Sequence, residues 1–467
     1  MMTENAELRF PFPNAAAPLE PAEEYARLRA RRPVVAVTLP TGDRAWLVTR
    51  YADVRQIYTD PRFSRAAAVR SGAPRANSVG PDPESIVAQD PPEHTRLRRL
   101  VAPAFTARRI EALRAGVEAL AHRLVDGMRA AGPPADLVTG LAVPLAGTTI
   151  SELLGIPPSD RGRFRSWSEV VMSTTAHPPE AIRAAQRQFE EYVSALIADR
   201  RRSPGEDLIG VLVAARDQRD RLSEKELVNL AWTLLLTGFE TTSSQIVNFV
   251  VVLLRHPDRL DRLRDEPARI PGAVEELLRY APRRIDGGAI RVAREDVELA
   301  GVTVRAGEAV IPAIASANRD EERFPHADEL DLGRTDTAHL SFGLGAHHCL
   351  GAQLARVELQ SALGALLRGL TGLRLAVPER EVDWRAGTLV PTPTALPVTW
   401  ERPAPHHATG AGERDDARAT AADRPAARAG ERFPETAHPC PAESVTLIAP
   451  DTGRPVAPAP DAQGGER

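Results

Sequence analysis

A cysteine lies in a segment rich in glycine and histidine, Phe342-Gly-Leu-Gly-Ala-His-His-Cys-Leu-Gly351. The spacing of apolar residues after this segment predicts a helix that begins just after Cys349 and runs to about Leu370. Free N–H groups and the helix dipole at such a position favour a thiolate over a thiol. The glycines permit tight turns and let the backbone approach a flat ligand closely. The segment therefore has the chemistry of a thiolate ligand to a metal centre.

Three interpretations of this segment are open. Cys349 could be a buried structural cysteine in a glycine-rich turn. It could bind zinc together with His347 and His348, although adjacent residues cannot easily converge on one tetrahedral ion and the sequence has no Cys-x-x-Cys partner. It could also be the axial ligand of haem iron, where a thiolate pushes electron density that favours O–O cleavage.

A second pattern, Thr237-Gly-Phe-Glu-Thr-Thr242, lies in the middle of a long helical pattern. A capping box, Ser223-Glu-Lys-Glu226, begins this helix, and His256-Pro257 ends it after about 33 residues, or roughly 50 Å. Glycine costs ~1 kcal/mol inside a helix, and threonine hydroxyls can bond back to the preceding turn. We expect a local loosening of the helix that leaves a groove for O2 and water. A polar face or a helix–helix contact is the alternative.

Two further patterns pair charged residues on one helix face. Glu276 and Arg279 stand three residues apart, which is the spacing of a surface salt bridge worth ~0–1 kcal/mol. His94 and Arg98 stand four apart, on a helix that Pro91 and Pro92 help to start. They could bind the same carboxylate, or they could be ordinary surface charges.

In these four patterns, and in their order along the chain, the sequence resembles the cytochrome P-450 family. The pattern F-G-x-G-x-H-x-C-x-G matches the cysteine-ligand signature of that family at every fixed position. The resemblance covers roughly residues 20 to 400 and is greatest to actinomycete enzymes of secondary metabolism. It implies a mainly helical, triangular fold with a minor β region, in which haem lies between the long central helix and the helix after Cys349.

The resemblance also implies a role for each matching residue. Cys349 is the axial ligand of haem b, and Thr241, Glu240 and Gly238 assist oxygen activation by delivering protons. The residues expected around the haem and its propionates are Phe342, Gly343, Gly345, Gly351, His94, Arg98, Arg291 and His347. The expected structural ion pair is buried and consists of Glu276, Arg279 and Arg334. The family commonly has Ala or Gly where this chain has Thr237, which leaves the proton route open.

The implied reaction is NAD(P)H-dependent oxygenation by a class I enzyme. Apart from Cys349 the chain contains only Cys440, too few cysteines for an iron–sulfur cluster. Electrons are therefore expected from a ferredoxin and its reductase, docking at arginines such as Arg99 or Arg356. Two alternatives are oxidative coupling on the same haem without oxygen insertion, and a haem-binding sensor without turnover.

The substrate is the least readable part of the sequence. A small natural product, hydroxylated or epoxidised, fits the resemblance. The residues expected to line its pocket are Leu234, Thr237, Thr242, Ile285, Gly288, Ala289 and Pro393.

Composition narrows the setting. A net charge of −4 and a pI of about 6.3 give no electrostatic footprint for nucleic acid. Two cysteines exclude a disulfide framework and fit a reducing compartment. The first residues lack an apolar signal region, and polar residues interrupt the apolar stretch 227–254. We expect a monomeric cytoplasmic protein that does not bind a membrane.

The elements that must position these residues follow from local patterns. Residues 33–50 predict a hairpin around Pro40-Thr-Gly-Asp43, residues 107–200 are mainly helical, and short strands are expected between 289 and 313. We expect an N-terminal arm over 1–22, a catalytic domain over 23–400 and a disordered tail rich in Pro, Ala and Arg over 401–467.

Overall fold

The computed structural model describes residues 8–12, 18–75, 81–173, 176–205, 207–219, 222–282, 287–388 and 390–401. Contacts divide the chain into two units, Met1–Ala404 and Pro405–Arg467, and all described residues belong to the first. The predicted tail thus lies outside the described residues except for Glu401, and its boundary stays a prediction.

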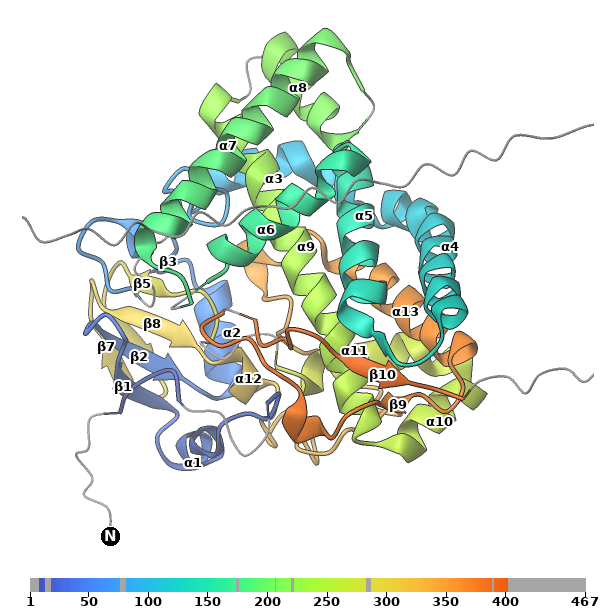
Figure 1. The fold of residues 1–467 in the computed structure, drawn as a ribbon. Helices are drawn as coiled ribbons and strands as arrows, with labels where there is room; N and C mark the ends of the chain where they lie inside the picture. Colours follow the sequence, from blue (N-terminus) through green and yellow to red (C-terminus); the bar gives the residue numbers. More distant parts are fainter. Residues whose placement is uncertain are drawn as a thin grey trace, which may run out of the picture. The chain divides into compact units, whose positions relative to one another are not determined.

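The first unit is mainly helical, which confirms the predicted fold class. Its helices are α1 (Glu23–Arg31), α2 (Tyr51–Thr59), α3 (Glu93–Val101), α4 (Ala107–Ala131), α5 (Val143–Leu154), α6 (Arg161–Val171), α7 (Pro179–Arg202), α8 (Leu208–Arg219), α9 (Glu224–Leu254), α10 (Pro257–Asp265), α11 (Ile270–Tyr280), α12 (Ile314–Ala317) and α13 (Ala352–Gly369). Within this unit, α7 and α8 lie at one corner, most strands at a second and α4 at a third (Figure 1).

The strands form three small sheets. The largest has the order β1 (Val34–Thr38), β2 (Arg44–Val48), β8 (Ala309–Pro312), β5 (Arg291–Ala293) and β3 (Phe63–Ser64). The others are β4 (Ala135–Asp136), β10 (Pro397–Thr399) and β9 (Arg374–Leu375), and the pair β6 (Val297–Leu299) and β7 (Val302–Val304). Strands β1 and β2 pair antiparallel, with Val34 opposite Val48, which confirms the predicted hairpin. Strands β5 to β8 confirm the short strands expected between 289 and 313.

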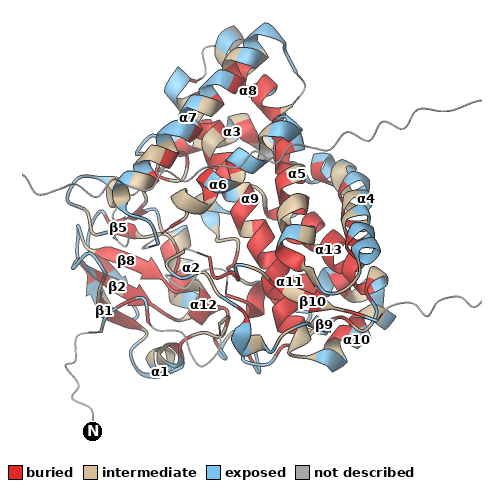
Figure 2. Ribbon diagram, viewed as in Figure 1, coloured by how far each residue is buried: buried red, intermediate tan, exposed pale blue. Residues whose placement is uncertain are grey.

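Helix α9 runs through the middle of the unit, as its capping box predicts. The Ser223 hydroxyl accepts a hydrogen bond from the Glu226 N–H at 3.1 Å, and the Glu226 carboxylate accepts one from the Ser223 N–H at 2.8 Å. Most of its side chains are buried against α5, α7 and α13. Figure 2 shows this central helix largely in red, whereas α7 and α8 expose one face. An apolar helix without a wide polar stripe belongs in a core.

The predicted Glu276–Arg279 pair is completely buried on α11. The Arg279 Nε and Nη2 atoms donate to the two Glu276 carboxylate oxygens at 2.8 Å each. Arg334 is the third member, because its Nε lies 3.1 Å from Glu276 Oε2. The other Arg279 donors bond to the carbonyl oxygens of Asn318, Ala327 and Glu329. The alternative of a solvated surface pair is therefore wrong, and the pair ties α11 to the segment 318–334.

Replacing Arg279 by Leu leaves the Glu276 carboxylate underpaired in the core. We expect the free energy of unfolding to fall by about 3–5 kcal/mol, the usual cost of breaking a buried pair. Arg27→Gln, which breaks the exposed Arg27–Glu24 pair, should cost less than ~1 kcal/mol. Urea unfolding followed by circular dichroism measures both, and equal small losses would contradict this interpretation.

Candidate active site

The cysteine loop connects a short 3₁₀ turn, Gly345–His347, to α13. The thiol of Cys349 is exposed, so the interpretation as a buried structural cysteine is wrong. The Cys349 N–H donates to the Phe342 carbonyl oxygen at 2.8 Å, which closes the loop. Gly343 and Gly345 have φ angles of +69° and +71°, and a Cβ on Gly345 would lie 2.5 Å from the Tyr58 carbonyl oxygen. Only glycine fits Gly345 without displacing α2.

Gly351 differs from these two glycines. Its φ is −83°, and an added Cβ would meet no heavy atom within 4 Å. The backbone at Gly351 is therefore one that other residues can adopt, and its expected place beside a flat ligand stays a prediction. The space beside the Gly351 Cα is open.

The four residues expected at the propionates come from three elements. His94 and Arg98 lie on α3, Arg291 begins β5 and His347 ends the 3₁₀ turn. The rings of His94 and His347 are 4.1 Å apart between centroids. Among the described residues, the buried atoms His94 Nδ1, Arg291 Nη1 and His347 Nε2 have no hydrogen-bond partner. Buried polar atoms are normally paired, so three unpaired nitrogens indicate an anionic ligand.

The electrostatics of this group support that conclusion. Burial lowers the pKa of His347 to about 2, and the charges of His94 and neighbouring arginines act in the same direction. Burial also lowers the pKa of His94 and of Arg291. The two imidazoles are therefore neutral near pH 7, Arg291 is a buried guanidinium, and each of the three has a nitrogen that a ligand could pair. A flat ligand with two carboxylates and a thiolate-seeking iron, which is haem, fits these donors and Cys349.

Zinc does not fit the same residues. Within the described ranges, no group of three or more His, Cys, Asp or Glu side chains is arranged to hold a metal ion. The zinc interpretation is therefore wrong, because His347 and His348 do not converge with Cys349 on one point.

The threonines of α9 bond back to the helix, as expected. Thr237 Oγ1 donates to the Thr233 carbonyl oxygen at 2.8 Å, and Thr241 Oγ1 donates to that of Thr237 at 2.7 Å. The helix nevertheless stays α-helical through this region. The expected loosening is therefore wrong: these hydroxyls share carbonyl oxygens without displacing the backbone bonds. Thr237 is exposed although the turns on both sides of it are buried.

Gly238 serves helix packing. A Cβ at this residue would lie 2.7 Å from Ile150 Cδ1 on α5. A larger residue at this position would require the Ile150 side chain to move.

Glu240 is buried and belongs to a chain of charges that sequence reasoning missed. Burial raises its pKa, while the nearby Arg385 opposes that shift. Arg385 lies 3.6 Å from Glu240 and 3.2 Å from Glu169, which in turn bonds to Arg165 at 3.0 Å. A cavity of about 10 Å³ beside Glu240 has room for about one water molecule. Arg385 carries no motif, so only the folded structure could reveal it.

The residues expected to line the substrate pocket differ in burial. Leu234, Thr242 and Pro393 are buried, Thr237 is exposed and Ala289 is half-buried. A Cβ on Gly288 would lie 2.8 Å from Tyr58 Oη and from Pro312 Cγ, so its packing neighbours fill that space. Its place in a substrate pocket stays a prediction. Ile285 lies outside the described residues.

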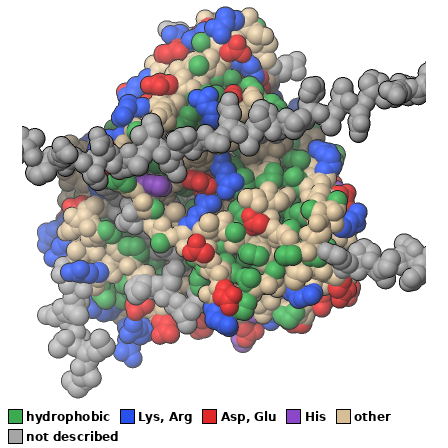
Figure 3. Space-filling view, in the orientation of Figure 1, with side chains coloured by type: hydrophobic (Ala, Val, Ile, Leu, Met, Phe, Trp, Pro, Cys, Tyr) green, Lys and Arg blue, Asp and Glu red, His purple; other side chains and the backbone are tan. Residues whose placement is uncertain are grey.

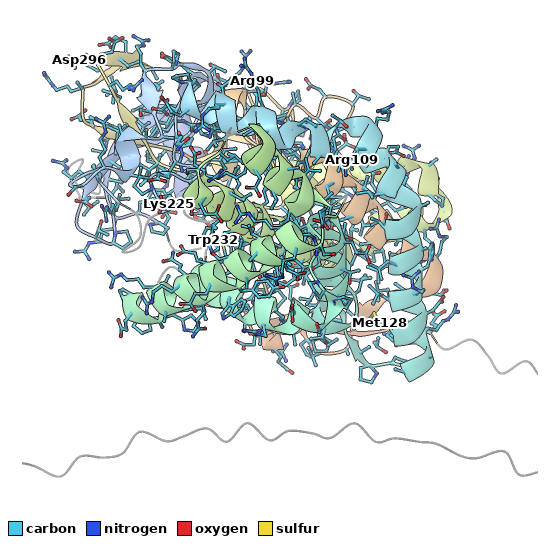
Figure 4. All side chains as sticks on the ribbon, turned by 90° about the horizontal axis from the view of Figure 1, so that it is seen from above. Arg99, Arg109, Met128, Lys225, Trp232 and Asp296 are labelled. Carbon is cyan, nitrogen blue, oxygen red and sulfur yellow. The ribbon has the colours of Figure 1, made fainter. Side chains whose placement is uncertain are left out.

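The two arginines expected at a docking surface differ. Arg99 is exposed on α3 and lies at the periphery of the unit (Figure 4). Arg356 is paired with Glu275 and is only partly exposed. On the face drawn in Figure 3, acidic and basic side chains are interspersed. No helix among the described residues has the length and apolar character needed to cross a membrane.

Comparisons with known proteins agree with this site. Residues 177–372 match the family described as Cytochrome P-450. The chain is 50% identical over 400 residues to nocardicin C N-oxygenase of Nocardia uniformis subsp. tsuyamanensis, covering 85% of this chain and 100% of that one. It is 47% identical over 403 residues to mycinamicin IV hydroxylase/epoxidase of Micromonospora griseorubida, with coverages of 85% and 100%. The crystal structure of HinD with NMFT and NO has a TM-score of 0.82 at 49% identity, covering 85% and 100%.

The fold and these comparisons define the class of protein, a haem-thiolate oxygenase. The chain belongs to the cytochrome P-450 family, in its actinomycete branch. It is a monooxygenase that uses haem, O2 and electrons from redox partners, and it acts on a small molecule. The relatives are an N-oxygenase and a hydroxylase/epoxidase, which favours oxygen insertion over the coupling alternative and over a sensor without turnover.

Arg291→Gln removes a buried cation that has an unpaired donor. A hydrogen bond to a charged group is worth ~1.5–3 kcal/mol, so we expect haem to be lost about ten- to a hundredfold faster. The transfer of haem to excess apomyoglobin measures this rate. Arg294→Gln, an exposed arginine in the same segment, is the matched control. Equal haem loss from both variants would show that Arg291 does not hold the haem.

Proposed function

We propose that Cys349 is the axial ligand of haem b in a class I monooxygenase that hydroxylates or epoxidises a natural product. The observation that carries the proposal is the exposed residue Cys349 in the same loop as His347, whose Nε2, like His94 Nδ1 and Arg291 Nη1, is buried without a hydrogen-bond partner among the described residues. A structural loop would leave neither feature, because unpaired buried donors cost free energy. The haem, when bound, supplies the oxidising chemistry, and the protein supplies ligation, orientation and protons.

The haem-binding residues divide into two sets. His94, Arg98, Arg291 and His347 would hold the two carboxylates from α3, β5 and the 3₁₀ turn. Burial lowers the pKa of Arg98, and the charge of the nearby Cys349 sulfur opposes that shift. On the thiolate side, Gly343 and Gly345 let the loop approach α2, and Phe342 covers the sulfur.

Glu240 and Thr241 are the proposed route for protons. A buried carboxyl with a raised pKa keeps a proton closer to neutral pH than an exposed one, which suits a general acid. Arg385 and Glu169 link Glu240 to Arg165, whose side chain is 31% exposed. The Thr241 hydroxyl, now donating to the Thr237 carbonyl, can turn to donate to a group beside the helix. Thr237 adds a second hydroxyl one turn earlier.

The substrate class follows from the relatives' names, which refer to nocardicin C and mycinamicin IV. We infer that this chain acts on a related kind of compound, a small product of actinomycete secondary metabolism. Ferredoxin and ferredoxin reductase are the proposed electron donors, and Arg99 is the described residue best placed to meet an acidic ferredoxin. We further propose a monomer in the cytoplasm, with no nucleic-acid partner.

Turnover under isotopically labelled O2 tests the proposal, using ferredoxin, its reductase and a substrate found by optical titration. The wild-type product should carry one labelled oxygen atom. Because general acid–base steps contribute ~100-fold or more, Thr241→Ala should lower the product formed per NAD(P)H consumed about tenfold or more. Thr241→Ser, which keeps the hydroxyl, should restore most of it.

Two results would contradict the proposal. A coupled product without label would assign the chain to oxidative coupling. Unchanged coupling in Thr241→Ala would remove that hydroxyl from proton delivery.

A further inference from the structure

Arg356 turns back from α13 onto the residue that begins the cysteine loop. It stands in the second turn of α13, seven residues after Cys349. Its guanidinium carbon is 4.7 Å from the centre of the Phe342 ring, within the ~6 Å range of cation–π contacts. Its position over this ring is not that of a side chain free to meet a partner.

Glu275 of α11 holds the Arg356 guanidinium in this orientation. The Nε and Nη2 atoms of Arg356 donate to the two Glu275 carboxylate oxygens at 2.7 and 2.9 Å. Both side chains are partly buried, with 23% and 20% exposed. Two parallel bonds of this kind fix the plane of an arginine, which lysine cannot reproduce.

His339, three residues before Phe342, also contacts the Glu275 carboxylate. Its Nε2 lies 3.3 Å from Glu275 Oε2, and its Nδ1 accepts the Ser341 N–H at 3.2 Å. The His339 side chain is only 2% exposed. Burial would raise the pKa of Glu275, but hydrogen bonds from His339 and Arg356 bring it to about 2.

The position of Phe342 matters because its carbonyl oxygen accepts the Cys349 N–H at 2.8 Å. A shift of Phe342 therefore moves the backbone of Cys349. Glu275 connects α11, α13 and the residues before the loop, because its carboxylate bonds to Arg356 and to His339, and the rings of His339 and Phe342 are 5.9 Å apart between centroids.

We propose that Glu275, Arg356 and His339 form a clamp that fixes Phe342 and thereby the geometry of the Cys349 thiolate. This inference rests on the proposed function of Cys349 as the iron ligand. Arg356 is then a positioning residue and not a docking cation for ferredoxin.

The test uses the holoenzyme and four variants: Glu275→Gln, Arg356→Gln, Arg356→Lys and the double variant Glu275→Gln/Arg356→Gln. Amide hydrogen exchange in the segment 339–350 and the midpoint potential of the iron are measured. Losing one charge-assisted bond should speed exchange about tenfold and shift the potential in the same direction in every single variant. Because both residues act on one contact, the double variant should change little beyond Arg356→Gln alone.

Arg356→Lys separates the clamp from a docking charge. This variant keeps the positive charge and loses the two parallel hydrogen bonds to Glu275, so it should behave like Arg356→Gln. Arg99→Gln makes the same charge change on an exposed residue of α3 and should leave exchange and potential unaltered.

Three outcomes would overturn the clamp. The first is that hydrogen exchange is unchanged in all Arg356 variants. The second is that Arg356→Lys behaves like wild type while ferredoxin-dependent reduction is slower in Arg356→Gln, and the third is that the effects of Glu275→Gln and Arg356→Gln are fully additive in the double variant. A wild-type spectrum without a thiolate ligand would instead contradict the proposed function, while hydrogen exchange would still report on the clamp.

Discussion

Arg279 is a fully buried cation, and the region around the cysteine loop depends on how its donors are satisfied. Desolvating a guanidinium is tolerated only when its donors find acceptors. Glu276 supplies two, and the carbonyl groups of Asn318, Ala327 and Glu329 supply the rest. Fixing these carbonyls fixes the long segment that leads back to the haem side of the unit.

The same network reaches the cysteine loop. Asn318 donates to the Ser341 hydroxyl at 2.8 Å and accepts the Leu340 N–H at 2.8 Å, while Ser341 donates to the Leu278 carbonyl oxygen. Phe342 follows directly. Helix α11 thus uses two consecutive acids, Glu276 for the buried pair and Glu275 for Arg356. One helix thus positions both the residues that lead to the loop and, through Arg356, the Phe342 ring.

The residues proposed to bind the haem propionates contrast with Arg279. Arg279 has all its bonding groups satisfied, whereas His94, Arg291 and His347 each keep a buried nitrogen without a partner among the described residues. The first arrangement stabilises the fold, and the second requires an anionic ligand. What separates the structural Arg279 from the residues proposed to bind the cofactor is whether their hydrogen-bonding groups have partners, more than charge itself.

Local features of the chain could be predicted from sequence because they depend on neighbouring residues. The capping box at Ser223, the hairpin at 33–50 and the helix after Cys349 are of this kind. Arg334 was predictable only through the family resemblance, since no local pattern links it to Glu276. The contact of Gly238 with Ile150, the pairing of Arg385 with Glu240 and the clamp at Arg356 depend on packing between distant elements. Periodicity carries no information on such packing.

The absorption spectrum of the reduced protein with carbon monoxide tests the central claim most directly. Wild-type protein should show the red-shifted Soret band typical of a thiolate-ligated haem. Cys349→His should lose that band while still binding haem, and Cys440→Ser, the change at the other cysteine, should retain it. A thiolate band that survived in Cys349→His, or disappeared in Cys440→Ser, would contradict the assignment of Cys349 as the iron ligand.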